Sequence, residues 1–397
     1  MVPFPMQRFD SNSDFIGLDC LALPENFSGA AYYVYHLAKN LLESPRRFSF
    51  AIFCTPKHAP LFSSLLKTSD KMVSVPIKNR AQKIFFYEFQ LKSLLIKENV
   101  KVFYATHYIC PPKSSRYFLI NTFHDMGFLL YPQYYPFIKK LYFGRRMKTF
   151  LARADRIVAI SHSTAAAISR LFPGSASKIS VIHSGADHLL AHKTFERFWQ
   201  QPSLAGKTFQ RFYSTTPYIL AVNTFERRKN FPFIIRVFNY LKRKYKIGHK
   251  LLLIGQPANG LKAAKAEVEN SPFKPDITIA HAVSIEELIF YYRHCDFFMN
   301  ASAYEGFGFT PFEAINFGCP AFLFKNNAIS ELLGDHLYIF DHLDAEKWAE
   351  FIKSEIDNHF QNKILRDAIE HLTWQNTTES VLSLFEKRIP SEEPNLV

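Results

Sequence analysis

The sequence predicts an α/β protein of two domains, each built on a parallel sheet. Length is the first observation, because 397 residues exceed what one hydrophobic core usually organises. The second is an alternation of short apolar stretches with longer helical ones in both halves, as in parallel α/β sheets. The third is the loss of this alternation over residues 191–216, where Gln, Pro, Ser and Thr gather as in a linker. We therefore expect an N-terminal domain over residues 1–205, a C-terminal domain over 206–373 and a last helix within 374–397.

Each expected strand is a short apolar stretch, and each expected helix repeats its apolar residues at helical spacing. The N-terminal strands are Phe15–Leu21, Phe48–Cys54, Lys101–Tyr104, Tyr117–Asn121, Arg156–Ile160 and Ile179–Ile182. The helices between them are Ala31–Leu42, Phe85–Glu98, Phe137–Ala154 and Ser163–Leu171. The C-terminal strands are Tyr218–Val222, Lys250–Ile254, Ile277–Ala280, Phe297–Asn300 and Pro320–Phe324. The helices there are Phe231–Lys244, Ile285–Arg293, one that ends at Phe317, and Trp374–Lys387. Ligands of parallel sheets bind beyond the carboxyl ends of the strands, so residues that follow strands are the candidate site residues.

Basic residues are concentrated in the first half of the chain. The net charge is +13, yet residues 1–205 contain 26 Lys and Arg against 12 Asp and Glu, and residues 206–397 contain 22 against 23. This asymmetry indicates an anionic partner of the first half: a nucleic acid, a phospholipid surface or a phosphorylated substrate. No recognised nucleic-acid-binding module occurs, so nucleic acid is not expected.

Other classes of protein are disfavoured by what the sequence lacks. No apolar run is long enough to predict a transmembrane helix, and the first residues do not follow the pattern of a signal peptide. The five Cys are scattered and form no CxxC pair, so we expect neither a disulfide framework nor a zinc cluster. We expect a cytoplasmic protein.

The segment SAYEGFGFTPFEA, residues 302–314, carries the strongest chemical signal. It follows an expected strand and opens a helix, whose free N–H groups favour an anion such as a diphosphate. Gly306 and Gly308 allow a ligand to approach the backbone closely. Glu305 and Glu313 bracket the loop, and each carboxylate can accept two hydrogen bonds from a sugar diol.

This segment resembles the E-x7-E donor signature of the GT4 family of retaining glycosyltransferases, which have the two-domain GT-B fold. The resemblance implies that Glu305 contacts the transferred sugar and Glu313 the ribose hydroxyls of a nucleotide-sugar donor. It also implies that the donor lies against the loop between them, at Gly306, Phe307, Gly308, Phe309 and Thr310.

The loop NTFERRKN, residues 223–230, resembles the family's Arg-Lys-Asn loop. This resemblance implies that Lys229 holds the donor diphosphate and that Arg228 is a second cation there. Cations at this place stabilise the charge that develops on the leaving nucleoside diphosphate. Two positions depart from the family pattern: Asn223 stands where many members have Gly, and Thr224 where some have Arg.

The N-terminal half matches the family less completely. Of a loop that is typically Gly-Gly-x-Gly-Arg-Tyr only Gly29 remains, and the resemblance implies that it approaches the donor diphosphate. His124 and Asp125 resemble the family's His-Asp pair on the acceptor side, where the His lies near the donor sugar and the acceptor. The resemblance also implies two Rossmann-like domains facing across a cleft, with the last helix returning toward the first domain.

Together these motifs predict a retaining hexosyltransferase that acts on a saccharide or lipid-linked acceptor in lipopolysaccharide-type glycan synthesis. GDP-mannose is the favoured donor, and UDP-sugars stay open. Neither cofactor nor metal is expected, because the chain has no Asp-x-Asp and its cations can supply the charge. Two alternatives stay open: a non-catalytic GT-B protein with an eroded donor loop, and a GT-B sugar-nucleotide epimerase.

The helix expected at residues 137–154 mixes apolar and basic residues, as membrane-surface helices do. One interpretation is binding to the inner face of an anionic membrane through Lys139, Lys140, Arg145 and Arg146. The other is a packed helix whose basic face is simply solvated.

Overall fold

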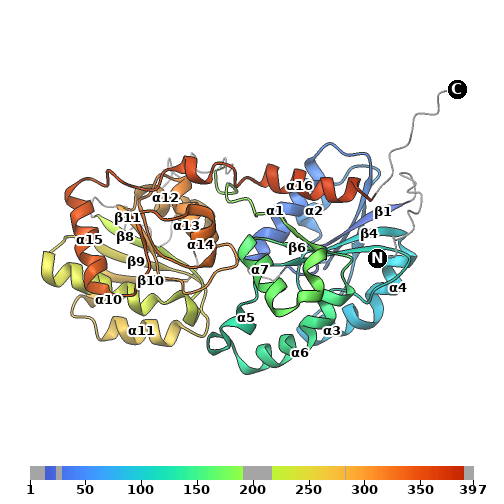
Figure 1. Ribbon diagram of the computed structural model, residues 1–397. Coiled ribbons are helices and arrows are strands. Elements are labelled where there is room, and N and C mark those ends of the chain that lie inside the picture. Colours follow the sequence, from blue (N-terminus) through green and yellow to red (C-terminus); the bar gives the residue numbers. More distant parts are fainter. Residues whose placement is uncertain (1–13, 24–28, 191–216, 282, 389–397) are drawn as a thin grey trace. The chain divides into compact units, whose positions relative to one another are not determined.

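The computed structural model describes residues 14–23, 29–190, 217–281 and 283–388. Contacts divide the chain into two compact units. The first unit comprises the described residues of Met1–Leu130, Tyr135–Gly185 and Thr373–Val397, and the second those of Tyr131–Tyr134 and Ala186–Leu372. Figure 1 shows that each unit is a sheet flanked by helices.

The first unit has a parallel seven-stranded sheet in the order β3-β2-β1-β4-β5-β6-β7. Its strands are β1 (Phe15–Asp19), β2 (Ser49–Cys54), β3 (Lys71–Ser74), β4 (Val100–Ala105), β5 (Phe118–Phe123), β6 (Arg156–Ala159) and β7 (Ile179–Val181). Strands β2 and β5 are buried along their whole length, as expected of strands covered by helices on both faces.

The longer helices of the first unit are α1 (Ala30–Glu43), α6 (Phe137–Arg153), α7 (His162–Leu171) and α16 (Trp374–Glu386). Shorter ones are α2 (Pro60–Ser63), α3 (Arg80–Phe85), the π-helix η1 (Phe86–Gln90), α4 (Leu91–Lys97), α5 (Gly127–Leu130) and the 3-10 helix η3 (Pro173–Lys178). Helix α16 packs against α1, so the end of the chain belongs to the first unit (Figure 1).

The second unit has a parallel six-stranded sheet in the order β10-β9-β8-β11-β12-β13. Its strands are β8 (Tyr218–Val222), β9 (Lys250–Ile254), β10 (Ile277–Ala280), β11 (Phe297–Asn300), β12 (Ala321–Phe324) and β13 (Ile339–Phe340). Its α-helices are α10 (Phe231–Tyr245), α11 (Leu261–Glu269), α12 (Ile285–His294), α13 (Phe309–Asn316), α14 (Asn327–Leu333) and α15 (Ala345–Asp357). The 3-10 helices are η2 (Pro132–Tyr134), η5 (Arg227–Lys229), η6 (Lys274–Asp276) and η7 (Arg366–Ile369).

Both sheets reverse their strand order at one place, and this positions the candidate sites. In the first unit the order runs outward from β1 in one direction and from β4 in the other. In the second unit the same reversal lies between β8 and β11. Ligands of open α/β sheets bind beyond the carboxyl ends of the strands at such reversals.

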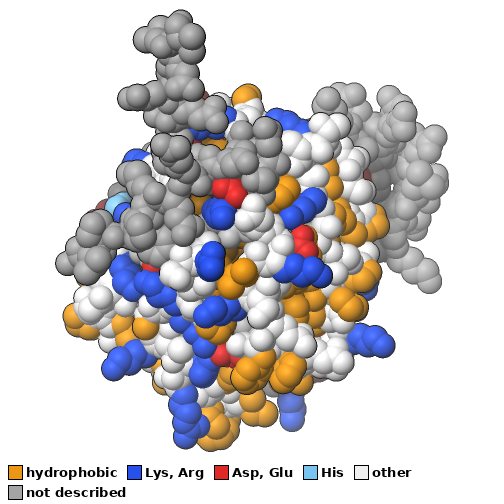
Figure 2. Space-filling model, turned by 90° about the vertical axis from the view of Figure 1, so that its right-hand side faces the viewer, with side chains coloured by type: hydrophobic (Ala, Val, Ile, Leu, Met, Phe, Trp, Pro, Cys, Tyr) orange, Lys and Arg blue, Asp and Glu red, His pale blue; other side chains and the backbone are white. Residues whose placement is uncertain are grey.

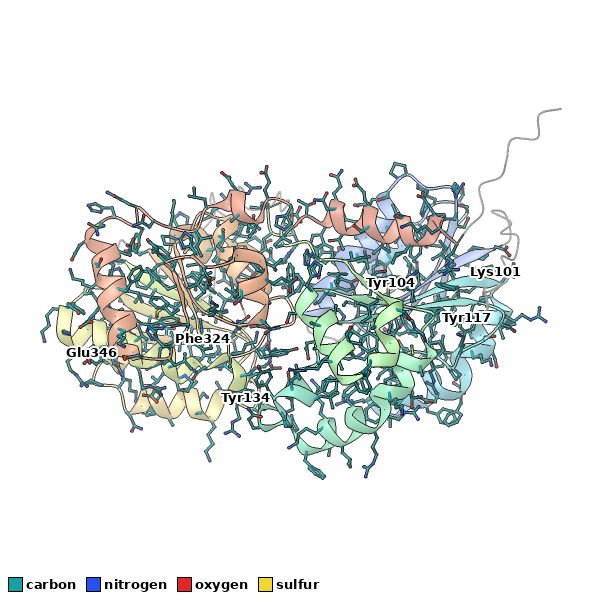
Figure 3. All side chains as sticks on the ribbon, in the orientation of Figure 1. Lys101, Tyr104, Tyr117, Tyr134, Phe324 and Glu346 are labelled. Carbon is teal, nitrogen blue, oxygen red and sulfur yellow. The ribbon has the colours of Figure 1, made fainter. Side chains whose placement is uncertain are left out.

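The predicted two-domain α/β class with parallel sheets is confirmed. The expected linker 191–216 and the boundary at 205 lie outside the described residues. Two short segments group with the second unit instead of the first: Ala186–Leu190 and Tyr131–Tyr134. The Nδ2 amide of Asn259 donates to the carbonyl oxygen of Tyr134 at 2.8 Å, which ties the latter segment to the second unit (Figure 3).

The helix expected at residues 85–98 is present, but it begins earlier, at Arg80, and contains a π turn. The chain there forms α3, then the π turn η1, then α4. A π turn inserts one residue into the helical spacing, and an apolar repeat read from sequence does not register that insertion. No helix in the described ranges is long and apolar enough to cross a membrane.

Candidate active site

The loops that follow β8 and β11 bring together the strongest candidates of the second unit. Lys229 Nζ donates to Glu305 Oε1, and Arg228 Nη1 donates to Glu305 Oε2 at 2.9 Å. Arg228 also donates through Nε to Glu226 Oε2 at 2.6 Å and through Nη1 to the carbonyl of Tyr304 at 2.6 Å. The two expected cations and the first expected carboxylate therefore form one ion cluster at the carboxyl edge of the sheet.

Burial makes this cluster electrostatically strong. Glu305 is 5% exposed and Lys229 is 7% exposed. Burial alone would raise the pKa of Glu305, but Lys229 and Arg228 outweigh it and lower that pKa to about 2. Burial lowers the pKa of Lys229, and Arg228 lowers it further, whereas Glu305 opposes both effects.

Glu313, the second carboxylate of the motif, lies in α13 and has different partners. Tyr292 of α12 donates its hydroxyl to Glu313 Oε2 at 2.7 Å, and His188 Nε2 lies 3.1 Å from Glu313 Oε1. The ring of His188 meets that of Phe309 edge-on, with centroids 5.9 Å apart. These partners fix the carboxylate at the start of the helix, one turn from its free N–H groups.

The glycine-rich loop has the backbone geometry that its sequence predicts. Gly308 adopts a left-handed φ of 93°, which disfavours any side chain, and immediately precedes the first residue of α13. Phe307 is buried, with its ring 5.1 Å from those of Phe309 and Phe312. Thus Phe307 anchors the loop in the core, whereas Gly306 and Thr310 are only half-buried.

A second loop, which sequence reasoning did not single out, supports the loop that carries Arg228 and Lys229. A Cβ on Gly255 would lie 1.6 Å from the carbonyl oxygen of Asn223, and one on Gly260 would lie 2.7 Å from the carbonyl carbon of Glu226. The amide of Gly260 donates to the carbonyl of Phe225 at 2.7 Å. The signal in the sequence was a pair of glycines after β9.

Asn327 is another supporting residue that sequence reasoning missed. It lies at the start of α14, and its Nδ2 donates to the carbonyl of Glu305 at 2.8 Å while its Oδ1 accepts from the amide of Glu305 at 3.4 Å. Tyr292 and His188 were missed as well, because all three contacts span a long separation in sequence.

In the first unit, His124 directly follows β5 and is buried. Its Nε2 lies 2.8 Å from the carbonyl oxygen of Thr106. A carbonyl only accepts, so Nε2 carries the hydrogen and Nδ1 keeps its lone pair in the neutral ring. Burial lowers the pKa of His124, against the carbonyl of Thr106 and the charge of Asp125. The ring of Tyr33 meets it edge-on, with centroids 4.9 Å apart.

The remaining N-terminal candidates, Asp125 and Gly29, lie in turns that precede helices. Asp125 Oδ1 accepts from the amide of Gly127 at 2.7 Å and so holds the turn that starts α5. Gly29 precedes α1 with a positive φ of 44°, and a Cβ there would meet no atom of the described residues within 4 Å. The positive φ strains any residue other than glycine at this position.

Some of the basic residues of helix α6 form ion pairs within the first unit. Arg146 pairs with Glu88 of η1, and Arg153 Nη2 lies 2.7 Å from the same carboxylate. Arg146, one of the four basic residues considered for membrane binding, therefore forms an ion pair within the first unit. Arg145 is exposed, and Lys139 and Lys140 are half-buried.

Chemically, the second unit offers buried cations, a helix N-terminus and two carboxylates held on separate partners. This set suits a ligand that carries both an anionic group and neighbouring hydroxyls. The first unit offers a neutral histidine with an available lone pair.

Two families match the sequence. The family described as Glycosyltransferase Family 4 matches residues 27–188, and the family described as Glycosyl transferases group 1 matches residues 207–371. The chain is similar to the O-antigen chain mannosyltransferase RfbU of Salmonella typhimurium, with 24% identity over 314 residues that cover 77% of this chain and 81% of RfbU.

Solved structures are similar over nearly the whole chain. Sucrose-phosphate synthase from Thermosynechococcus elongatus has a TM-score of 0.69 at 16% identity, covering 94% of this chain and 98% of that one. HepE of Anabaena, solved with UDP and glucose, has a TM-score of 0.67 at 15% identity, covering 94% of this chain and 100% of that one. At these identities the likeness shows a shared fold.

Proposed function

This chain belongs to the GT4-type glycosyltransferases of the GT-B fold, and from that premise we propose that it is a retaining hexosyltransferase. Its donor would be a nucleotide-diphosphate sugar, and its acceptor a saccharide or lipid-linked glycan of lipopolysaccharide-type biosynthesis. Relatives that are O-antigen mannosyltransferases support this acceptor class.

The ion cluster of Lys229, Arg228 and Glu305 carries the proposal. A diphosphate that reaches the start of α13 would meet the N–H groups of the helix and these two cations. Glu305 would then accept hydrogen bonds from the sugar, and Glu313 from the ribose. Bond cleavage puts negative charge on the leaving diphosphate, so cations fixed in place before the reaction lower the barrier.

His124 is the proposed catalytic residue of the first unit. Because its Nε2–H is held by the carbonyl of Thr106, the available lone pair is on Nδ1. That nitrogen would accept a hydrogen bond from a hydroxyl of the sugar or of the acceptor. The acceptor hydroxyl would attack the anomeric carbon from the face that the diphosphate leaves, so no enzymatic nucleophile is required. Its proton would pass to the leaving phosphate, which acts as the base.

We propose GDP-mannose as the donor. The mannosyltransferase relatives support this choice, whereas HepE, solved with UDP and glucose, keeps UDP-sugars as candidates. We also propose transfer without a divalent metal, since Arg228, Lys229 and the helix N-terminus can balance the diphosphate. Loss of transfer after EDTA treatment, restored by Mg²⁺ or Mn²⁺, would contradict that part.

Thermal stabilisation by a panel of GDP- and UDP-sugars tests the donor site. Ligand at a hundredfold excess over its dissociation constant stabilises by about 2.7 kcal/mol. We expect stabilisation by one nucleotide family, reduced in Lys229→Ala and in Glu313→Gln. Lys265→Ala is the matched control, since Lys265 is an exposed lysine of α11 in the same unit.

The outcome separates the proposal from its alternatives. Stabilisation without transfer to any acceptor would favour the non-catalytic binding protein. Conversion of the donor sugar to its epimer, without an acceptor, would favour the epimerase. A folded protein that no donor stabilises would overturn the proposed function.

A membrane-bound acceptor is the remaining part of the proposal. Helix α6 exposes 70% of Phe137, 79% of Ile138 and 42% of Leu141 beside its basic residues. Figure 2 views the side that lies to the right in Figure 1, and hydrophobic and basic side chains are intermixed there, with few acidic ones. Such a surface suits peripheral binding to an anionic membrane.

A further inference from the structure

Two cysteines meet in the second unit, although 24 positions separate them in the sequence. The Sγ atoms of Cys295 and Cys319 are 2.8 Å apart, and both cysteines are free thiols in the structure. Cys295 directly follows α12, and Cys319 lies between α13 and β12. Spacing in the sequence does not predict this contact, because it depends on which strands are neighbours in the sheet.

The backbone fixes both thiols at the amino-terminal edge of the sheet. The strands that they precede, β11 and β12, are paired neighbours. The amide of Cys295 donates to the carbonyl of Tyr291 at 3.1 Å, and the amide of Cys319 donates to that of Ala314 at 3.0 Å. Each cysteine is thus held by the helix before it as well as by the sheet. A disulfide has a sulfur–sulfur distance of about 2.05 Å, so the two sulfur atoms need to approach by less than about 1 Å.

Burial makes these thiols slow to react but leaves them in contact. Cys295 is 8% exposed and Cys319 is 4% exposed. Burial raises the pKa of Cys295 well above its usual range, and the neighbouring Cys319 and the charge of Asp296 raise it further. Because the thiolate is the reactive form, the first oxidation is slow at neutral pH and faster at high pH. The second step is fast, because the partner sulfur already lies beside the first.

We propose that Cys295 and Cys319 are a site of reversible covalent modification, at which a peroxide closes an intramolecular disulfide. One thiolate attacks an oxygen of the peroxide, the O–O bond breaks, and the products are a sulfenic acid and a hydroxide that is protonated to water. The second thiol attacks the sulfenic sulfur, whose oxygen leaves as water. In sum the two thiols lose two electrons and two protons, and one hydrogen peroxide is reduced to two waters. Hydrogen peroxide suits the site because it is small enough to reach a nearly buried sulfur.

The disulfide would join the two helices that position Glu313. Tyr292, near the end of α12, donates its hydroxyl to Glu313 of α13, and its ring stacks with that of Phe317 with centroids 6.0 Å apart. The loop that the bond closes, residues 295–319, contains β11, the glycine-rich loop and α13. A crosslink restricts the unfolded chain, so it would stabilise the segment that carries Glu305 and Glu313. This inference goes beyond the proposed transferase function and does not depend on it.

Peptide mass spectrometry of the full chain tests the modification. Trypsin leaves both cysteines in one peptide, residues 294–325, because no Lys or Arg lies between Arg293 and Lys325. After treatment with hydrogen peroxide, denaturation and alkylation, we expect this peptide to carry no alkyl group and to be two hydrogen atoms lighter than its reduced form. Dithiothreitol should restore both alkylation sites.

Cys110 is the internal control. It is buried as well, but its thiol donates to the carbonyl of Phe150 at 3.7 Å. At the peroxide dose that closes the disulfide in most molecules, Cys110 should still be alkylated. Alkylation of both Cys295 and Cys319 at that dose, or their oxidation to sulfinic acids without a disulfide, would overturn the proposal. This result comes from the wild type, so it does not depend on the folding of any variant.

The variants Cys295→Ala and Cys319→Ala separate the two chemical steps. Without its partner, the remaining thiol should stop at the sulfenic acid, which dimedone labels. Labelling of the wild type at these positions should be at least tenfold lower, because the second thiol consumes the sulfenic acid. Equal labelling of wild type and variants would contradict closure of the disulfide.

Thermal unfolding tests the effect on the segment that the disulfide encloses. The Tm of oxidised wild type should fall by about 3 °C or more when dithiothreitol opens the bond, and Cys319→Ala treated in the same way should show no change. A rise in Tm on reduction would show that the bond displaces α12 and α13, against the inference. Stabilisation by nucleotide-sugars is measured separately on reduced protein, so failure of the proposed function and failure of the disulfide are distinguishable.

Discussion

At the scale of single residues, the Glu305 carboxylate depends on cations that lie 76 and 77 positions earlier in the chain. Removing one member of a buried ion cluster leaves the others uncompensated, which typically costs about 3–5 kcal/mol. We expect Glu305→Ala to lower the free energy of unfolding by that amount in urea denaturation. In the double variant Glu305→Ala/Lys229→Met the loss should be smaller than the sum of the single losses.

The sign of the pH dependence follows from the lowered pKa. The pKa of Glu305 is about 2 in the folded protein against an ordinary 4.5. The ionised Glu305 therefore makes its full contribution to the free energy of unfolding above pH 4.5, and this contribution is lost as the pH falls toward 2. Glu269→Ala removes an exposed carboxylate of the same unit and should change stability by less than about 1 kcal/mol. A similar cost for both variants would contradict the buried cluster.

Asp19 should show the opposite pH dependence. Burial raises its pKa from 3.8 to about 6, although Tyr87, Lys83 and the amide of Leu21 act against the rise. The folded state thus binds this proton more tightly, so the contribution to stability is present below pH 4 and is lost as the pH rises through 6. Between pH 5 and 7.5 the loss is about 1 kcal/mol.

The variant Asp19→Asn isolates that contribution. The difference in unfolding free energy between variant and wild type should shift in favour of the variant by about 1 kcal/mol from pH 5 to 7.5. In Tyr87→Phe, which lacks the hydroxyl that favours the ionised carboxylate, the dependence should move to higher pH. A difference between Asp19→Asn and wild type that is constant with pH would refute the shifted titration.

The resemblance to the GT4 motifs, together with the residue types in the loop after the expected strand, predicted Glu305, Glu313, Arg228 and Lys229 as candidates, because motif residues are close in sequence. They did not predict that Glu305 binds both cations, nor that Tyr292 holds Glu313. Such contacts join separate loops, and only the order of strands in the sheet determines which loops meet.

At the scale of elements, the sequence predicted strands better than helices. Strand β8 has the predicted bounds because a fully buried strand is a continuous apolar run. Helices α11 and α15 were not predicted: α11 is short, and charged residues separate the apolar ones in α15. The sequence also did not predict that the loop after β9 supports the loop with Arg228 and Lys229. That support depends on glycines whose spatial neighbours are distant in the chain.

The supporting loop after β9 gives a prediction for an element. A Cβ on Gly255 would lie 1.6 Å from the backbone oxygen of Asn223, so Gly255→Ala must displace the loop that holds Arg228 and Lys229. We expect at least a tenfold loss of donor affinity in titrations of the folded variant. Gly248→Ala is the control, because a Cβ there would meet no atom within 4 Å in the part of the chain that the structure describes. Unchanged affinity in Gly255→Ala would show that the loop adjusts without moving the cations.

At the scale of the whole molecule, composition predicted the charge asymmetry between the two halves of the chain. It did not predict which of the charged and apolar side chains are exposed. Composition places the excess of positive charge in residues 1–205. Composition does not show that Arg146 forms an ion pair with Glu88, or that Phe137 and Ile138 are exposed beside the remaining cations. Those facts depend on which face of α6 packs against the sheet.

Binding to vesicles tests whether this surface meets a membrane. Each basic residue near an anionic bilayer contributes about 1 kcal/mol, so Lys140→Glu/Arg145→Glu should weaken binding to phosphatidylglycerol vesicles at least 30-fold at low salt. Lys262→Glu/Lys265→Glu makes the same change in net charge on α11 of the second unit and should have little effect. Phe137→Ser/Ile138→Ser should weaken binding at high salt as well, because apolar contacts are not screened. If both pairs of charge reversals weaken sedimentation with vesicles equally, the protein is attracted to the membrane by its net charge. That result would contradict a membrane-binding surface on α6.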